Sequence, residues 1–143
     1  MSKDLPYTII LVDDDFTVNY FNKIVLEDAG ITQQVRDFTS PIDALQYIQN
    51  ASQRGDFTKK GVADIIFIDI NMPEMDGFEF IEQLELTCKD VLRGAALCML
   101  SSSEHARDKK RASELGVCCY YSKPLDEHKI NEIILKLQAR EKS

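Results

Sequence analysis

Carboxylates end two of the most apolar stretches of this sequence. The stretch YTIILV is followed at once by Asp13, Asp14 and Asp15, and the stretch DIIFID ends in Asp69. Carboxylates that lie close together repel one another unless a cation neutralises them, and their oxygens are the ligands that Mg²⁺ prefers. If the two stretches are neighbouring strands, Asp13, Asp14 and Asp69 therefore form a candidate site for a divalent cation.

Two further polar residues follow later apolar stretches. Ser101 comes directly after a run at 95–100, and Lys123 comes shortly after a run at 117–121. A lysine supplies a point charge that pairs with a phosphoryl oxygen or, at rest, with Asp69. The Ser101 hydroxyl supplies a hydrogen-bond donor. Because aspartate is an established phosphoryl acceptor, the pattern predicts a pocket that holds a metal ion and then a phosphoryl group.

Each of these residues also has a purely structural interpretation. Carboxylates that precede a helix stabilise its N-terminus, and Asp15 is the best N-cap candidate, so we assign it no metal role. Asp69 and Lys123 would form an ordinary buried salt bridge, which is compatible with the chemistry above. Ser101 begins a run of three serines, a composition typical of turns. Its spacing from Asp69 and Lys123 favours the functional interpretation.

Apolar strands alternate with amphipathic helices along the chain. Apolar runs predict strands buried on both faces, with a weaker pattern in the second of them, at residues 7–12, 33–38, 64–69, 95–100 and 117–121. Helical spacing, with Ser40 as an N-cap and Gly30 and Gly116 as stops, predicts helices at 16–29, from 41 onward, and at 78–87, 104–115 and 126–139.

These elements form five strand–helix units. Such an alternation predicts a parallel sheet with helices on both faces, and a ligand site beyond the carboxyl ends of the strands. The polar segment 51–63 is long for a connection between a helix and a strand. We interpret it as a surface insertion.

Composition narrows the class of protein. The chain has 143 residues, enough for one domain with a real core, and a net charge of −7. This acidity argues against direct nucleic-acid binding and against an anionic membrane surface. There is no apolar run long enough for a membrane span, no apolar core of a signal peptide, and no CxxC motif among the four cysteines. We therefore expect a cytoplasmic protein whose cysteines are small buried hydrophobic residues.

Four segments together resemble the receiver domain of two-component response regulators. They are ILVDDD at 10–15, IIFIDINMPEMDG at 65–77, MLSSS at 99–103 and YYSKP at 120–124. The intervals of 32 residues from Asp69 to Ser101 and 22 residues from Ser101 to Lys123 also agree with that family. The resemblance covers nearly the whole chain. It implies a flavodoxin-like α/β fold, a doubly wound parallel five-stranded sheet in the order 2-1-3-4-5 with helices on both faces.

The resemblance also implies a set of metal ligands. Asp69 would be both the phosphoacceptor and a ligand of Mg²⁺, and Asp14 would bind the ion directly. Asp13 would act mainly through a metal-bound water. The backbone carbonyl of Asn71 would complete the protein ligands, and Mn²⁺ is the alternative metal.

Other residues are assigned by the resemblance to catalysis and switching. Lys123 matches the family's pocket lysine, and the bond from this lysine to the following Pro124 is typically cis. Ser101 takes the place of the switch hydroxyl, and Tyr120 takes the place of the aromatic switch residue on the last strand. Plain packing is the alternative for Tyr120, and the adjacent Tyr121 leaves the register of the two rings open.

The expected function is that of a phosphorylatable signalling module. We expect residues 1–143 to form a single receiver domain with a core of about 7–139 and no output domain. A sensor histidine kinase or a histidine phosphotransfer protein would donate the phosphoryl group. The module would catalyse only its own phosphorylation and dephosphorylation. A downstream protein would bind the surface of the fourth helix, fifth strand and fifth helix, without contact to nucleic acid or membrane.

Two other interpretations stay open on the sequence. A phosphatase of the haloacid dehalogenase type also uses a strand-end aspartate with Mg²⁺, but that family has a second aspartate where this chain has Asn71. The other interpretation is a binding module of the same fold that is never phosphorylated, although every key side chain of the pocket is present.

Overall fold

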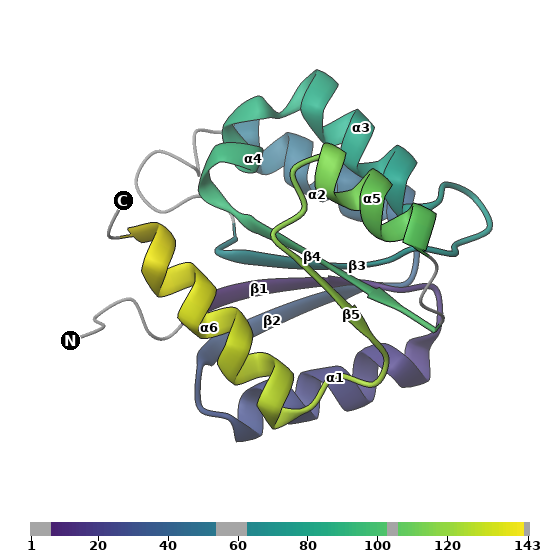
Figure 1. The fold of residues 1–143 in the computed structure, drawn as a ribbon. Coiled ribbons are helices and arrows are strands. Elements are labelled where there is room, and N and C mark those ends of the chain that lie inside the picture. Colours follow the sequence, from purple (N-terminus) through teal and green to yellow (C-terminus); the bar gives the residue numbers. More distant parts are fainter. Residues whose placement is uncertain (1–6, 54–62, 103–105, 142–143) are drawn as a thin grey trace.

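The computed structural model describes residues 7–53, 63–102 and 106–141, in which five strands alternate with helices (Figure 1). The strands are β1 (Tyr7–Val12), β2 (Thr32–Phe38), β3 (Ile65–Asp69), β4 (Ala96–Ser101) and β5 (Cys119–Ser122). The helices are α1 (Phe16–Asp28), α2 (Pro41–Gln53), α3 (Gly77–Thr87), α4 (Lys89–Gly94), α5 (Ala106–Glu114) and α6 (Glu127–Glu141). Within these ranges no helix is both long and apolar enough to cross a bilayer.

The strands form one parallel sheet in the order β2-β1-β3-β4-β5, which confirms the predicted fold. Helices α1 and α6 cover one face, and α2, α3, α4 and α5 cover the other (Figure 1). Strands β3 and β4 are buried along their whole length. Because both of their faces are covered, their sequences are continuously apolar rather than alternating. The strand order reverses between β1 and β3, the point where ligands bind in such sheets.

Side chains that are neighbours on a strand pack into opposite layers. Ile66 and Ile68 belong to the apolar cluster beneath α2 and α3, whereas Ile65 and Phe67 belong to the cluster beneath α1 and α6. A slip of one residue in register would exchange these two sets. The two cores therefore fix which residues reach the carboxyl edge of the sheet together.

Predicted caps begin and end several of the helices. The Asp15 side chain accepts hydrogen bonds from the first turn of α1, and the Ser40 hydroxyl accepts one from the backbone N–H of Asp43 at 3.2 Å. Gly30 and Gly116 follow α1 and α5 with φ of 72° and 84°, a backbone region that favours glycine. The four cysteines are free thiols, and three of them are buried.

Most predicted elements have ends that differ from the observed ones by no more than two residues, as for β5, which was predicted at 117–121 and spans Cys119–Ser122. Two differences go further. Helix α2 continues to Gln53, into the segment predicted to be an insertion, because Ala51 lies at a fully buried position. Residues 54–62 of that segment lie outside the described residues. Helix α4 was not predicted. The non-helical Cys88, with φ of −142°, ends α3, and six residues are too few to show a helical period.

A close backbone approach at Gly77 sets the start of α3 against the end of β3. A Cβ at Gly77 would lie 2.5 Å from the carbonyl oxygen of Asp69 and 2.8 Å from the Met99 side chain. The Gly77 N–H also donates a hydrogen bond of 2.8 Å to the carbonyl of Ile70. A side chain here must therefore displace the backbone of the residue that ends β3.

We predict that Gly77→Ala lowers the free energy of unfolding by about 1–3 kcal/mol, the usual cost of overpacking. Helix propensity alone predicts the opposite sign, since alanine is the better helix former. The matched control is Gly94→Ala, where the added Cβ meets no atom within 4 Å. Urea unfolding of the two variants separates these effects, and a Gly77→Ala protein as stable as the parent would contradict the close approach.

Candidate functional site

Three carboxylates meet at the carboxyl edge of the sheet. β1 and β3 are hydrogen-bonded neighbours, with Val12 opposite Ile68, so the residues that come next lie side by side. Carboxylate oxygens of Asp13, Asp14 and Asp69 all lie within 4.8 Å of one another. Asp13 and Asp69 are buried and Asp14 is exposed. The predicted convergence of these residues is confirmed.

Lys123 lies against two of the carboxylates. Its Nζ is 2.7 Å from Oδ2 of Asp13 and 3.1 Å from Oδ1 of Asp69. The Lys123 backbone N–H donates a hydrogen bond of 2.7 Å to the carbonyl of Ser101, which ties the end of β5 to the end of β4. The Lys123–Pro124 peptide bond is cis, as the resemblance implies. In the sheet, β3 lies between β1, which Asp13 follows, and the pair β4 and β5. The Lys123 ammonium, which follows β5, therefore reaches Asp13 and Asp69 from the side of β3 that faces away from β1.

Burial and neighbouring charges shift the pKa values of two pocket residues, Asp69 and Lys123. Burial and the charge of Asp13 raise the pKa of Asp69 to about 6, against the opposing effect of Lys123. Burial favours the neutral form of Lys123, but its hydrogen bond to Asp13 and the charge of Asp69 outweigh burial and raise its pKa. Lys123 is therefore a cation throughout the physiological range, whereas the pKa of Asp69 lies about two units above its ordinary value of 3.8.

The three successive aspartates have different surroundings. Asp13 uses both carboxylate oxygens, since Oδ1 accepts a hydrogen bond of 2.9 Å from the Asp15 N–H and Oδ2 contacts Lys123. Asp15 caps α1, as predicted, through hydrogen bonds from Thr17 and Val18. Asp14 turns its exposed side chain to the mouth of the pocket. Asp14 and Asp15 are both exposed, but of these two only Asp14 belongs to the carboxylate cluster.

The remaining predicted residues lie around this cluster. Ser101 is the last residue of β4 and is buried, one position beyond the Leu100 that pairs with Asp69. Asn71 is exposed and lies two residues beyond Asp69 in the loop to α3. Both therefore belong to the same edge of the sheet. Their roles stay predictions, because position alone does not assign them.

The two tyrosines of β5 point into opposite layers. Tyr120 pairs in register with Met99 and packs against the cluster on the α5 side of the sheet. Tyr121 packs on the α6 side, where its hydroxyl donates a hydrogen bond of 2.8 Å to Glu132. The hydroxyl of Tyr120 is buried, and among the described residues it has no hydrogen-bond partner. The register that the sequence left open therefore places Tyr120 on the face towards α5.

Asn19 contributes to the site and was not predicted. Its Nδ2 donates hydrogen bonds of 3.0 Å to the carbonyl of Asp13 and 3.1 Å to the carbonyl of Phe38. It thus ties α1 to the ends of β1 and β2 and holds the backbone of a pocket carboxylate. A signal was present in the sequence, because Asn19 and Asn22 share the inward helical face with Leu26 and are buried.

The donor set suits a hard cation. Three carboxylates face one ammonium, which leaves a formal charge of −2 when all of them are ionised. A divalent ion would neutralise this charge, and Asp13, Asp14 and Asp69 offer only oxygen ligands. The cluster can therefore hold a metal ion between the exposed Asp14 and the buried Asp69, with Lys123 beside Asp69.

Known proteins match this chain along most of its length. Response regulator Rre1 of Synechocystis is 25% identical over 138 residues, which cover 96% of this chain and 54% of that protein. The chain thus spans about half the length of that relative. Sensor histidine kinase CheAY of Helicobacter pylori is 25% identical over 93% of this chain and 15% of its own length.

Solved structures and a family profile agree with these relatives. The crystal structure of a two component response regulator from Cytophaga hutchinsonii superposes with a TM-score of 0.82 at 28% identity, covering 92% of this chain and 96% of that one. The sequence profile of the response regulator receiver domain matches residues 9–135. This chain therefore belongs to the response regulator receiver domain family.

Proposed function

We propose that Asp69 accepts a phosphoryl group from a phosphohistidine of a sensor histidine kinase or a histidine phosphotransfer protein. The observation that carries this proposal is the meeting of three carboxylates with Lys123 at the switch point of the sheet. A receiver domain in a phosphorelay has the same requirement, an acceptor carboxylate beside a neutralising cation.

The transfer exchanges one bond for another. An Asp69 carboxylate oxygen attacks the phosphorus, the new O–P bond forms, and the P–N bond to the donor imidazole breaks with its electron pair on nitrogen. The nitrogen takes up a proton as the donor histidine leaves. Lys123, already 3.1 Å from Asp69, pairs with a phosphoryl oxygen. The hydroxyl of Ser101 donates a further hydrogen bond to the transferred group.

Asp14, Asp69 and the backbone carbonyl of Asn71 would hold Mg²⁺, with Mn²⁺ as the alternative, and Asp13 would act through a bound water. The ion, when bound, neutralises charge on the phosphoryl oxygens. The exposure of Asp14 supports its direct role. The engagement of both Asp13 oxygens supports its indirect one.

Phosphorylation would switch the surface through Ser101 and Tyr120. Ser101 ends β4 and lies two residues after Met99, the register partner of Tyr120, so strand alternation puts Ser101 and Tyr120 on the same α5 side of the sheet. The Tyr120 hydroxyl is buried and has no hydrogen-bond partner within residues 7–53, 63–102 and 106–141, and such a group costs about 1–3 kcal/mol. This cost would be removed if the Tyr120 ring moved to a position where its hydroxyl forms a hydrogen bond. A shift from 1:99 to 99:1 requires about 5.5 kcal/mol of differential stabilisation, which new bonds from Ser101 to a phosphoryl group would help to supply.

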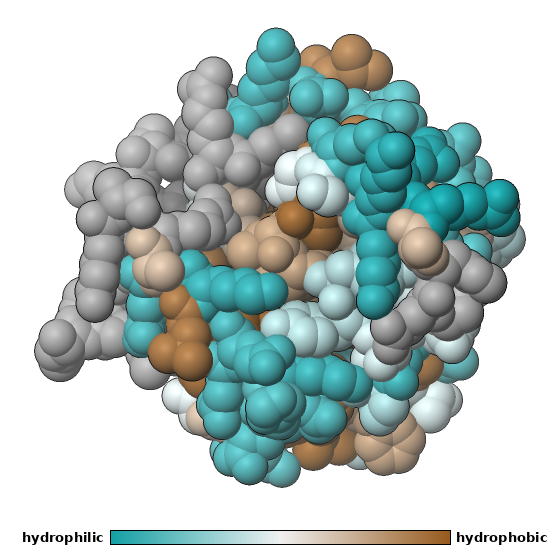
Figure 2. Space-filling model, viewed as in Figure 1, coloured by the Kyte–Doolittle hydropathy of each residue, from teal (hydrophilic) through white to brown (hydrophobic). Residues whose placement is uncertain are grey.

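The downstream target would bind over α5, β5 and α6, the surface predicted as fourth helix, fifth strand and fifth helix. Figure 2 supports this proposal, because less polar side chains over β5 lie between hydrophilic side chains over α5 and α6. Such an apolar strip with a polar rim is typical of protein interfaces. Neither nucleic acid nor membrane takes part in this proposal, and a cytoplasmic location stays a prediction.

The phosphodonor would approach along α1, which starts beside the pocket. Phe16, Tyr20 and Phe21 are more than half exposed, and Phe16 follows the N-cap Asp15 directly. The ring centroids of Phe16 and Tyr20 lie 6.5 Å apart, so the aromatic side chains form one patch. Exposed aromatic groups next to a reactive site favour a protein partner over a small substrate.

Asp69→Asn is predicted to abolish phosphorylation. With acetyl phosphate and Mg²⁺, the parent protein should gain one phosphoryl group by intact mass, and the variant should gain none because the amide is not a nucleophile. The control is Asp15→Asn, which removes a neighbouring charge and keeps an N-cap residue. The assignment would be refuted if the Asp69→Asn variant were phosphorylated, or if only the Asp15→Asn variant failed to be phosphorylated.

The raised pKa of Asp69 predicts a pH-dependent change in stability without divalent ions. The pKa is about 6 in the folded protein against an ordinary 3.8, so the stabilising proton is lost as the pH rises through about 6. Asp69→Asn is insensitive to this loss. Relative to the parent, it should gain of the order of 1–2 kcal/mol between about pH 5 and about pH 8.

Urea unfolding with a chelator measures this difference. Asp28→Asn is the control, an exposed aspartate at the far end of α1, and its effect should stay level with pH. Excess Mg²⁺ should reduce the advantage of Asp69→Asn, because the ion stabilises the parent pocket. A difference that shrinks as the pH rises would contradict the raised pKa.

A further inference from the structure

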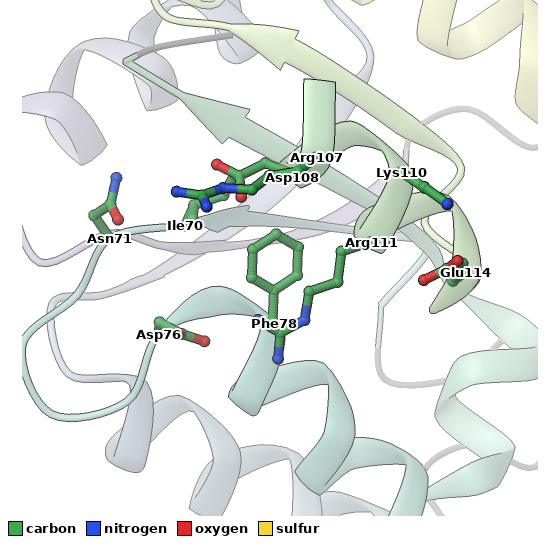
Figure 3. A pocket seen from close by; sticks show the side chains of 9 residues that line it. All are labelled: Ile70, Asn71, Asp76, Phe78, Arg107, Asp108, Lys110, Arg111 and Glu114. Atoms are coloured by element: carbon green, nitrogen blue, oxygen red, sulfur yellow. The ribbon is translucent and has the colours of Figure 1, made fainter. Parts of the chain in front are cut away.

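Cationic side chains outside the acidic pocket differ in what holds them. Those of α5 line a groove in which acidic side chains are mixed with them (Figure 3). On α6, the Lys129 ammonium instead contacts the backbone of the segment that carries Lys123. Its Nζ donates one hydrogen bond of 2.7 Å to the carbonyl of Ser122 and another of 2.7 Å to the carbonyl of Pro124. No step proposed above uses Lys129.

Lys129 lies at a helix position where a cation is unfavourable. It is the third residue of α6, and the helix dipole repels positive charge near a helix N-terminus. Asp126 fixes its backbone there, since Oδ1 of Asp126 accepts a hydrogen bond of 2.8 Å from the Lys129 N–H. The ammonium is 3.9 Å from the Asp126 carboxylate, and only 18% of the Lys129 side chain is exposed. The two backbone carbonyls are therefore its close partners.

The peptide unit between Ser122 and Lys123 is bound from both sides. Its N–H donates a hydrogen bond of 2.7 Å to the carbonyl of Ser101 on β4. In a planar trans peptide the C=O points away from the N–H, so the Ser122 carbonyl faces away from β4. Because β5 ends the strand order, no strand among the described residues lies on that side. The Lys129 ammonium supplies the donor that this carbonyl would otherwise lack.

Lys123 reaches the carboxylates from this doubly bound peptide unit. Its Nζ lies 2.7 Å from Oδ2 of Asp13 and 3.1 Å from Oδ1 of Asp69, at the end of a flexible four-carbon stem. The hydrogen bonds on the carbonyls of the preceding and the following residue fix the backbone from which that stem starts. Such precision matters for chemistry, because a displacement of about 1 Å can slow a reaction about a hundredfold.

We propose that Lys129 is a positioning residue, which holds the backbone of Lys123 and so keeps its ammonium on the two buried carboxylates. The proposal rests on the proposed function, in which that ammonium meets the phosphoryl group. The alternative is that Lys129 only stabilises the connection from β5 to α6.

Mg²⁺ binding distinguishes a positioning role from a purely structural one. At rest, the Lys123 ammonium contacts Asp13 and Asp69, whose oxygens a metal ion would also use. A well-placed Lys123 therefore competes with the ion. Loss of Lys129 should strengthen Mg²⁺ binding if Lys129 positions this competitor, whereas general damage to the pocket should weaken it.

The test is a double-mutant cycle on the full chain, with Mg²⁺ binding measured by isothermal titration calorimetry. Lys123→Met removes the competing ammonium and should lower the Kd for Mg²⁺ at least about tenfold. Lys129→Gln should lower this Kd at least about threefold, because the ammonium of Lys123 is no longer held on the carboxylates. In the Lys123→Met background, Lys129→Gln should change the Kd less than about 1.5-fold, since no ammonium is left to position.

Phosphorylation by acetyl phosphate at saturating Mg²⁺ is the second measurement, and it should change in the unfavourable direction. The rate should fall about tenfold in Lys129→Gln, because Lys123 is misplaced. It should largely recover in Lys129→Arg, whose guanidinium has enough donors for both carbonyls. The matched control is Lys136→Gln, which removes the same charge from α6 at a side chain whose Nζ lies 5.5 Å from the centroid of the Tyr121 ring. It should change either measurement less than about 1.5-fold.

Three results would overturn the proposal. They are weaker Mg²⁺ binding in Lys129→Gln, an equal effect of this substitution with and without the Lys123 ammonium, and an equal effect of Lys136→Gln. The proposed function can fail separately. If the parent protein were not phosphorylated while the Mg²⁺ cycle behaved as expected, the positioning of Lys123 by Lys129 would be supported and the phosphoacceptor role of Asp69 would not.

Discussion

Mutual repulsion among carboxylates is the constraint on which this site depends. Asp13 and Asp69 are buried side by side, and Asp14 lies within 4.8 Å of both. Burial, together with the charge of Asp13, raises the pKa of Asp69 to about 6, and Lys123 opposes this rise only in part. A pocket in this condition favours a proton or a cation, because either one restores neutrality. A bound cation would also offset the negative charge that a phosphoryl group adds to Asp69. The cost of keeping these carboxylates ionised without a counterion is therefore what would give the pocket its affinity for a cation.

The fold is organised to impose that constraint. Two apolar cores hold β1 and β3 in register, Asn19 fixes the backbone at Asp13, and the missing side chain of Gly77 lets α3 approach the carbonyl of Asp69. None of these residues is expected to touch the phosphoryl group. They make the carboxylates converge at one edge of the sheet. In the proposed switch, a change in charge at that edge would act through Ser101 and Tyr120. Helix α5 contacts both the last strand and the start of α3, with Lys109 over the ring of Tyr120 and Arg111 over the ring of Phe78.

Much of this arrangement could be predicted from the sequence, because burial on both faces leaves a continuous apolar signal. The apolar runs before Asp13 and Asp69 predicted two neighbouring strands. The intervals from Asp69 to Ser101 and Lys123 predicted which residues join the carboxylates in the pocket. Other features depend on tertiary contacts that a sequence does not display. The faces of Tyr120 and Tyr121 follow from strand register, and the end of α2 follows from the burial of Ala51. The six residues of helix α4 are too few to show a helical period.

The central claim is that one cradle holds a cation and a phosphoryl group on Asp69. The most direct measurement is a crystal structure of the protein with Mg²⁺ and beryllofluoride, a mimic of the phosphoryl group. We predict a beryllium–oxygen bond to the Asp69 carboxylate, Mg²⁺ about 2.1 Å from an oxygen of Asp14, and the Lys123 ammonium at about 3 Å from a fluorine. Beryllofluoride on another side chain, or Mg²⁺ bound without Asp14 and Asp69, would contradict the account.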